Sequence, residues 1–174
     1  SASIQTMAQT IKIQAGEQKE YEPEEGKNQE EEIRERKWQY ALDYASRFVR
    51  RGEVVAFPTD TFYGLAVDPF NLAAVKKLYD LKKRDYRKPV LLAVSSVSQV
   101  ERLTHDLPQV FYRLAERFWP GPLTMVLPAA KDLPPRVTGQ SGKIALRLPR
   151  CELAVAFVVA AGCPLTATSA NISK

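Results

Sequence analysis

The chain has 174 residues, 45% of them hydrophobic and 26% charged, which is typical of a folded globular domain. It has no apolar run near the ~20 residues needed to span a bilayer, and its one histidine and two isolated cysteines exclude a histidine-based metal cluster and a disulfide framework. Residues 1–37 carry nine acidic and six basic groups while residues 38–174 carry eleven and nineteen, so the basic body of the chain favours anionic partners such as nucleotide phosphates or RNA.

The N-terminal part of the chain is too polar to pack. Residues 1–32, which include EYEPEEGKNQEEE, are predicted to be a flexible acidic and polar segment, and the folded domain is predicted to cover 33–174. The location expected for the protein is the cytoplasm, or an organelle matrix or stroma if the first 16 residues are the remnant of a targeting segment. Cys151 and Cys163 are expected to be small buried hydrophobic residues.

Beyond residue 33 the pattern alternates between helices and strands. Apolar residues at helical spacing predict a first helix that ends at Gly52, Asn71 is placed to cap a second helix, and SSVSQVERL (95–103) predicts another capped helix. The remaining expected elements are strands at 53–57, 89–94, 122–127, 143–149 and 164–170, and helices over 108–118 and 152–161. Alternation of this kind predicts a layered α/β domain.

Several familiar catalytic arrangements are missing from the sequence. There is neither a GxxxxGK[ST] phosphate loop nor a GxGxxG fingerprint, so a nucleotide would have to be held in another way. A Ser-His-Asp arrangement would depend on His105, which lies in the polar loop THDLP and is expected at the surface.

Three polar stretches at the ends of predicted strands are candidates for a ligand site. FPTDTFYG (57–64) is either a strand-to-loop corner whose hydroxyl and carboxyl groups satisfy the turn, or a ligand site. Residues 76–88 hold seven basic groups against two acids, and form either a solvated helix end or a phosphate site. TATSAN (166–171) is either a plain turn or an anion cradle. Because open α/β sheets bind ligands at strand ends, the three together predict a small polar substrate beside a phosphate-bearing one.

Five motifs, taken in order, resemble one known family. PTDTFYGL (58–65), KKR followed by KP (82–89), WPGPLT (119–124), ALRLP (145–149) and TSAN (168–171) are similar to those of the YrdC-like threonylcarbamoyl-AMP synthases of tRNA t6A biosynthesis. The resemblance implies a three-layer α/β domain around a twisted, mixed parallel and antiparallel sheet. It also implies further elements after Lys174, so the domain is expected to lack its C-terminal part.

The resemblance assigns roles to particular residues. Lys82 and Arg84 are expected to grip the ATP phosphates and to be catalytic, and Thr61 and Arg147 are expected to contact the substrate threonine. The other residues expected at the nucleotide are Lys88, Lys143, Ser169 and Asn171.

The reaction that the resemblance implies joins L-threonine, bicarbonate and ATP into threonylcarbamoyl-AMP and pyrophosphate. A threonylcarbamoyl transferase complex then modifies adenosine 37 of tRNA, and tRNA itself is a further expected partner. Mg²⁺ is expected to be held mainly through ATP, because no acidic cluster is evident. The alternative is a non-catalytic, RNA-binding or regulatory YrdC-like module.

Overall fold

The computed structural model describes residues 29–60 and 62–171, and its first element is α1 (Gln29–Arg50). Residues 29–32, which the prediction placed in the flexible segment, form the first turn of this helix, and their acidic side chains favour its positive N-terminal end. The helix crosses residue 33 without a break. The chain divides into a unit ending at Ala41 and a larger unit that begins at Leu42, and the latter contains every strand and the candidate site.

The first helix ends where the sequence predicts. Gly52 has φ of +76°, in the left-handed region that glycine adopts at low cost, and its N–H donates to the carbonyl oxygen of Val49 at 2.9 Å. The other elements, in order, are β1 (Val55–Phe57), β2 (Gly64–Ala66), α2 (Leu72–Lys82), β3 (Leu91–Ala93), α3 (Val97–Leu103), α4 (Gln109–Phe118), β4 (Met125–Pro128), β5 (Lys143–Arg147), α5 (Glu152–Ala161), β6 (Leu165–Thr166) and β7 (Thr168–Ser169). No helix in the described ranges has the length and apolar character needed to cross a membrane.

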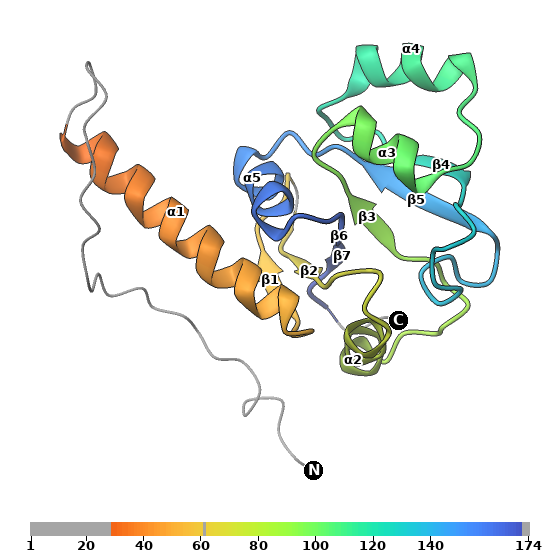
Figure 1. The fold of residues 1–174 in the computed structure, drawn as a ribbon, viewed down its shortest axis with the longest axis horizontal. Coiled ribbons are helices and arrows are strands. Elements are labelled where there is room, and N and C mark those ends of the chain that lie inside the picture. Colours follow the sequence, from red (N-terminus) through yellow and green to blue (C-terminus); the bar gives the residue numbers. More distant parts are fainter. Residues whose placement is uncertain (1–28, 61, 172–174) are drawn as a thin grey trace. The chain divides into compact units, whose positions relative to one another are not determined.

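The strands form two hydrogen-bonded sheets (Figure 1). The first has the order β1-β2-β7 and is antiparallel, and the second has the order β4-β5-β3-β6. In the second sheet β3 runs parallel to β5, while β4 and β6 are antiparallel to their neighbours. The α/β class with mixed pairing is therefore confirmed, but the expected single sheet is divided in two.

Thr166 joins the two sheets. Its side chain is fully buried, and its hydroxyl donates to the Leu65 carbonyl oxygen at 2.9 Å while accepting from the Val67 N–H at 2.9 Å. Both bonds are made to the β2 segment, although Thr166 itself lies in β6 of the other sheet. Because its donor and its acceptor are both satisfied, the buried Thr166 hydroxyl holds the two sheets in a fixed register.

Helices cover both faces of β3. Leu92 packs in a core cluster with residues of α2, α3 and α4, whereas the next residue, Ala93, packs with α5 and the C-terminal half of α1. Because successive strand residues point to opposite faces, this division places helices on either side of the sheet. The outcome is the layered arrangement that the sequence predicts.

Three local predictions need correction. The expected strand over 164–170 is interrupted at Ala167, so that it forms β6 and β7 in different sheets. The strand β2 is not predicted at all, because it begins at Gly64, inside the stretch interpreted as a corner or a ligand site. Cys151 and Cys163 are half-buried rather than fully buried.

Candidate active site

Lys82 is directed into the protein by the periodicity of α2. Asn71 is the N-cap of this helix, and its side-chain oxygen accepts the Ala74 N–H at 3.1 Å; the helix ends where Lys83 adopts φ of +49°. Val75, Leu78 and Tyr79 form the buried stripe of the helix, and Lys82 continues that stripe by one turn. As a result the Lys82 side chain is only 2% exposed.

The ammonium group of Lys82 binds the TSAN segment. It donates to the carbonyl oxygens of Ser169 and Asn171, the latter at 2.6 Å, and lies 3.4 Å from the Asn171 side-chain oxygen. The Ser169 hydroxyl in turn donates to the same Asn171 oxygen at 2.6 Å. Two of the three polar stretches singled out in the sequence therefore meet at one buried cation.

The positive charge of Lys82 is not neutralised within the described part of the chain, where no carboxylate forms an ion pair with it. Burial lowers the pKa of the Lys82 ammonium, and the positive charge of Arg84 lowers that pKa further. Carbonyl dipoles satisfy the donors of this group but bring no negative charge. A bound anion would supply that charge.

Arg84 lies just beyond the helix and is also incompletely satisfied. Its Nη2 donates to the Pro89 carbonyl oxygen at 2.8 Å. Its Nε is the one buried side-chain nitrogen or oxygen without a hydrogen-bond partner among residues 29–60 and 62–171. Since unsatisfied buried donors are uncommon, this N–H marks a position where a ligand oxygen could bind.

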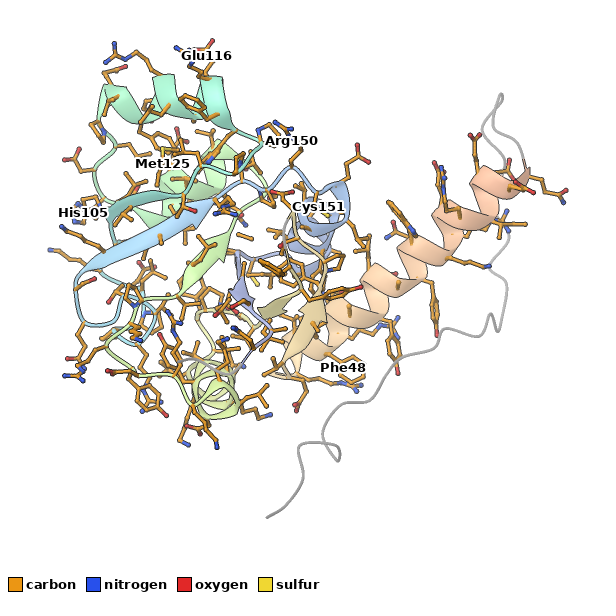
Figure 2. The ribbon with its side chains drawn as sticks, turned by 180° about the vertical axis from the view of Figure 1, so that it is seen from behind. Phe48, His105, Glu116, Met125, Arg150 and Cys151 are labelled. Atoms are coloured by element: carbon orange, nitrogen blue, oxygen red, sulfur yellow. The ribbon has the colours of Figure 1, made fainter. Side chains whose placement is uncertain are left out.

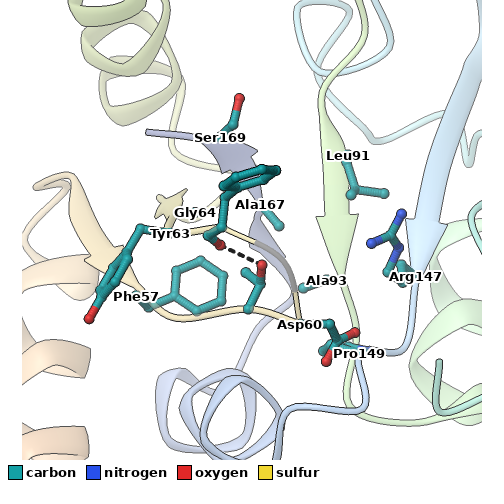
Figure 3. A pocket seen from close by; sticks show the side chains of 12 residues that line it. Phe57, Asp60, Tyr63, Gly64, Leu91, Ala93, Arg147, Pro149, Ala167 and Ser169 are labelled. Atoms are coloured by element: carbon teal, nitrogen blue, oxygen red, sulfur yellow. Dashed lines mark hydrogen bonds between the residues drawn. The ribbon is translucent and has the colours of Figure 1, made fainter. Parts of the chain in front are cut away.

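A pocket of about 190 Å³ opens on the face of β3 and β5 that points away from α3 and α4. Figure 3 shows Asp60 beside Pro149, near Arg147 of β5, while Tyr63 and Gly64 lie across the pocket from Arg147. The remaining lining residues include Phe57, Thr59, Leu91, Ala93, Ala167 and Ser169. FPTDTFYG thus lines a cavity rather than forming only a corner.

Arg147 is oriented by a threonine from the WPGPLT motif. The Thr124 hydroxyl accepts from Arg147 Nε at 3.1 Å and from its Nη2 at 2.8 Å. The guanidinium lines the pocket, where a planar fork of donors suits a carboxylate. Thr124 is not among the residues predicted from the sequence, although its motif is.

The other predicted residues have different outcomes. Lys88 is exposed, and its carbonyl oxygen accepts from the Tyr79 hydroxyl at 2.8 Å. Lys143 is exposed and lies at the opposite end of β5 from Arg147. When the β3–β5 register is continued two residues back along the chain, Lys143 pairs with Pro89. Thr61 lies outside the described residues. Roles for these three remain predictions.

His105 and both cysteines lie outside this pocket. His105 is exposed, as predicted, and is separated from Cys151 in Figure 2. Burial raises the pKa of the Cys163 thiol to about 12, which keeps it protonated and unreactive near neutral pH. The described part of the chain also contains no cluster of three histidine, cysteine, aspartate or glutamate side chains that could hold a metal.

A comparison with known families identifies the family of this chain. The model of the Sua5/YciO/YrdC family, described as "Telomere recombination", matches residues 47–174. The chain belongs to the Sua5/YciO/YrdC family. The resemblance found in the five motifs is therefore confirmed.

Individual members of the Sua5/YciO/YrdC family are similar over most of this chain. The threonylcarbamoyl-AMP synthase of Pyrococcus abyssi is 39% identical over 141 residues, which are 81% of this chain and 42% of that protein. The threonylcarbamoyl-AMP synthase of Bacillus subtilis is 44% identical over 130 residues, or 74% of this chain and 38% of that protein. The chain thus spans about two fifths of the length of these two curated relatives.

A solved structure in the family has the same fold. The crystal structure of P. abyssi Sua5 complexed with L-threonine matches with a TM-score of 0.76 and 38% identity, over 78% of this chain and 40% of that one. This likeness confirms the α/β architecture expected from the sequence.

Proposed function

We propose that this chain carries the activity named for its curated relatives and condenses L-threonine, bicarbonate and ATP into threonylcarbamoyl-AMP and pyrophosphate. The observation that carries the proposal is the buried, unneutralised charge of Lys82 beside the unpartnered Nε of Arg84. Two such groups at the end of one helix form a site for an anion, and ATP phosphates provide one.

The pocket supports a small amino acid as the second substrate. Its volume of about 190 Å³ is below the roughly 300–1,000 Å³ of pockets for drug-sized ligands. Arg147 would bind the carboxylate of threonine, and Thr61 would contact its polar side chain. P. abyssi Sua5, which has this fold, has been crystallised with L-threonine.

The proposed chemistry needs no protein nucleophile. The threonine amine and bicarbonate lose water to form a carbamate, one oxygen of which attacks the α-phosphorus. A phosphorus–oxygen bond forms there as the bond to pyrophosphate breaks. Because both reactants are anions, Lys82 and Arg84 would reduce their repulsion and stabilise the charge that develops on the leaving group. Holding both substrates in place supplies much of the remaining acceleration.

Metal and macromolecular partners belong to the same proposal. Mg²⁺ would be held chiefly by the ATP phosphates and by water, since the described residues lack a cluster of acidic ligands. Threonylcarbamoyl-AMP is a mixed anhydride that must be passed to an acceptor. A threonylcarbamoyl transferase complex that acts on tRNA would consume it.

Pyrophosphate release tests the proposal. Mixing the chain with Mg-ATP, bicarbonate and threonine should release pyrophosphate only when threonine is present, and Arg84→Ala should lower kcat/KM by about 100-fold. Arg87→Ala is the matched control, because it removes an arginine three residues away whose side chain is 84% exposed and paired with Asp85. We expect this control to stay within about twofold of the wild type.

Three results would contradict the proposed reaction. The first is pyrophosphate release that does not depend on threonine, and the second is no pyrophosphate release from a cooperatively folded sample. The third is an equal decrease of kcat/KM in the two arginine variants. Salt-sensitive tRNA binding without affinity for ATP would instead favour an RNA-binding module.

A further inference from the structure

Asp60 joins two segments that are distant in the sequence. Its Oδ1 accepts the Cys151 N–H at 2.6 Å, and its Oδ2 accepts the Arg150 N–H at 3.1 Å. These contacts span 90 and 91 residues. They connect the loop between β1 and β2 with the turn between β5 and α5.

The turn that Asp60 binds has no side-chain cap of its own. Cys151 is the N-cap residue of α5, and its side chain makes no capping hydrogen bond. Its sulfur instead lies 3.9 Å from the Pro58 carbonyl oxygen, on the same loop as Asp60. Two successive N–H groups next to a helix start attract a carboxylate, and Asp60 provides it from another part of the chain.

This connection joins two segments that line the pocket. Thr59 and Asp60 line it together with Arg147 and Pro149, Asp60 lies beside Pro149 in Figure 3, and the Asp60 contact begins one residue after Pro149. In the same loop the Thr59 hydroxyl donates to the Phe62 carbonyl oxygen at 2.5 Å. The placement of Thr59 and Asp60 against the segment that carries Arg147 and Pro149 therefore depends on the Asp60 contact.

The nucleotide end of the site has supports that Asp60 does not make. Lys82 is held by the TSAN carbonyls and Arg84 by the Pro89 carbonyl, and the TSAN segment meets the loop after β1 at Tyr63, whose carbonyl oxygen accepts the Ala170 N–H at 2.9 Å. A change at Asp60 should therefore alter the amino-acid end of the site and leave the nucleotide end intact.

We propose that Asp60 is a positioning residue, which sets the spacing between residues 58–60 and Arg147 and thereby the affinity for the amino-acid substrate. The substrate part of this inference rests on the proposed function. The geometric part concerns only the contact with residues 150 and 151. Both carboxylate oxygens are used, so an amide cannot replace them: one of its ends would present N–H donors to a backbone N–H.

The test uses three variants of the whole chain. Asp60→Asn removes one acceptor, and Asp60→Glu keeps both on a longer side chain. Asp68→Asn is the control, because a single Asp68 oxygen accepts the Phe70 N–H at 2.9 Å in a loop away from the pocket, and an amide oxygen can do the same. Thermal unfolding establishes that each variant is folded.

The first measurement is hydrogen exchange of the Arg150 and Cys151 amides by NMR, which needs no ligand. We expect Asp60→Asn to speed their exchange by at least about tenfold, Asp60→Glu to restore most of the protection, and Asp68→Asn to have no effect. Unchanged exchange in Asp60→Asn would overturn the proposed contact.

The second measurement is calorimetric titration with L-threonine and, separately, with Mg-ATP. We expect Asp60→Asn to weaken threonine binding about tenfold and to leave the ATP dissociation constant within about twofold. An equal loss of affinity for threonine and for Mg-ATP, or an unchanged affinity for threonine, would overturn the positioning role. A wild-type chain that binds neither ligand would contradict the proposed function and the substrate role of Asp60, while amide exchange would still decide whether the contact exists.

Discussion

Tyr79→Phe removes a buried hydroxyl that holds the segment after α2, which carries Arg84. The Tyr79 side chain is 1% exposed, and its hydroxyl lies 2.8 Å from the Lys88 carbonyl oxygen and 2.9 Å from that of Arg136. It therefore joins α2, the segment after it and the loop before β5. Losing a buried donor whose acceptors remain should lower the free energy of unfolding by about 1–2 kcal/mol, which is roughly 3–8 °C in Tm for a domain of this size.

Tyr86→Phe provides the matched control for this change. The two rings stack with centroids 5.0 Å apart, and both variants keep that stack. The Tyr86 hydroxyl, however, donates at 2.5 Å to Asp80, whose side chain is about half exposed. Water can replace such a bond, so its loss should cost about 0.5 kcal/mol or less.

Urea unfolding at pH 7 measures the loss of unfolding free energy in both variants. The slope of that free energy against urea concentration should be the same for the wild type, Tyr79→Phe and Tyr86→Phe. If Tyr79→Phe lowers the free energy of unfolding no more than Tyr86→Phe does, the reasoning is refuted, because burial of the Tyr79 hydroxyl would then have no energetic effect.

The same tyrosine predicts a dependence on alkaline pH. Burial raises the pKa of Tyr79 above its ordinary value of 10.0, so the unfolded chain ionises first as the pH rises. The contribution of Tyr79 to stability is therefore complete below pH 10 and is lost as the pH rises through the folded-state pKa. Tyr79→Phe should flatten this part of the stability profile, and an unchanged profile would assign it to other groups.

Two further predictions concern the loop before β5 and the half-buried thiol. Gly139 has φ of +58°, and an added Cβ would overlap the Arg87 carbonyl oxygen, so Gly139→Ala should lower the free energy of unfolding in urea by about 2–4 kcal/mol. At Gly142, with φ of +66° and open space around the Cβ position, the same change should lower it by only about 1 kcal/mol. Equal losses for the two variants would contradict the role of the overlap. In a Cys151→Ser background, Cys163 should react with a disulfide reagent at pH 8 far more slowly in the folded than in the urea-unfolded chain, because burial raises its pKa to about 12; equal rates would contradict that burial.

Local signals in the sequence were sufficient for most elements of the fold. Asn71 caps the helix that it was predicted to cap, and Ser96 caps the helix predicted over SSVSQVERL, each by accepting a backbone N–H three residues ahead. Gly52 ends α1 in the left-handed conformation that was expected. Such signals act within one helical turn, so they can be recognised without tertiary structure. The ordered motifs were likewise sufficient for the family.

The arrangement of the candidate site depended on contacts between distant residues. Lys82 meets Ser169 across 87 residues, and Asp60 meets Cys151 across 91. No local pattern shows that a lysine on a buried helical stripe will find carbonyl oxygens, or that a loop carboxylate will cap a remote helix. The connection between the two sheets is of the same kind, since Thr166 bonds to Val67 and Leu65 across 99 and 101 residues. The sequence thus predicted which polar groups are present, and tertiary packing decided which of them are used for structure and which remain to meet a ligand.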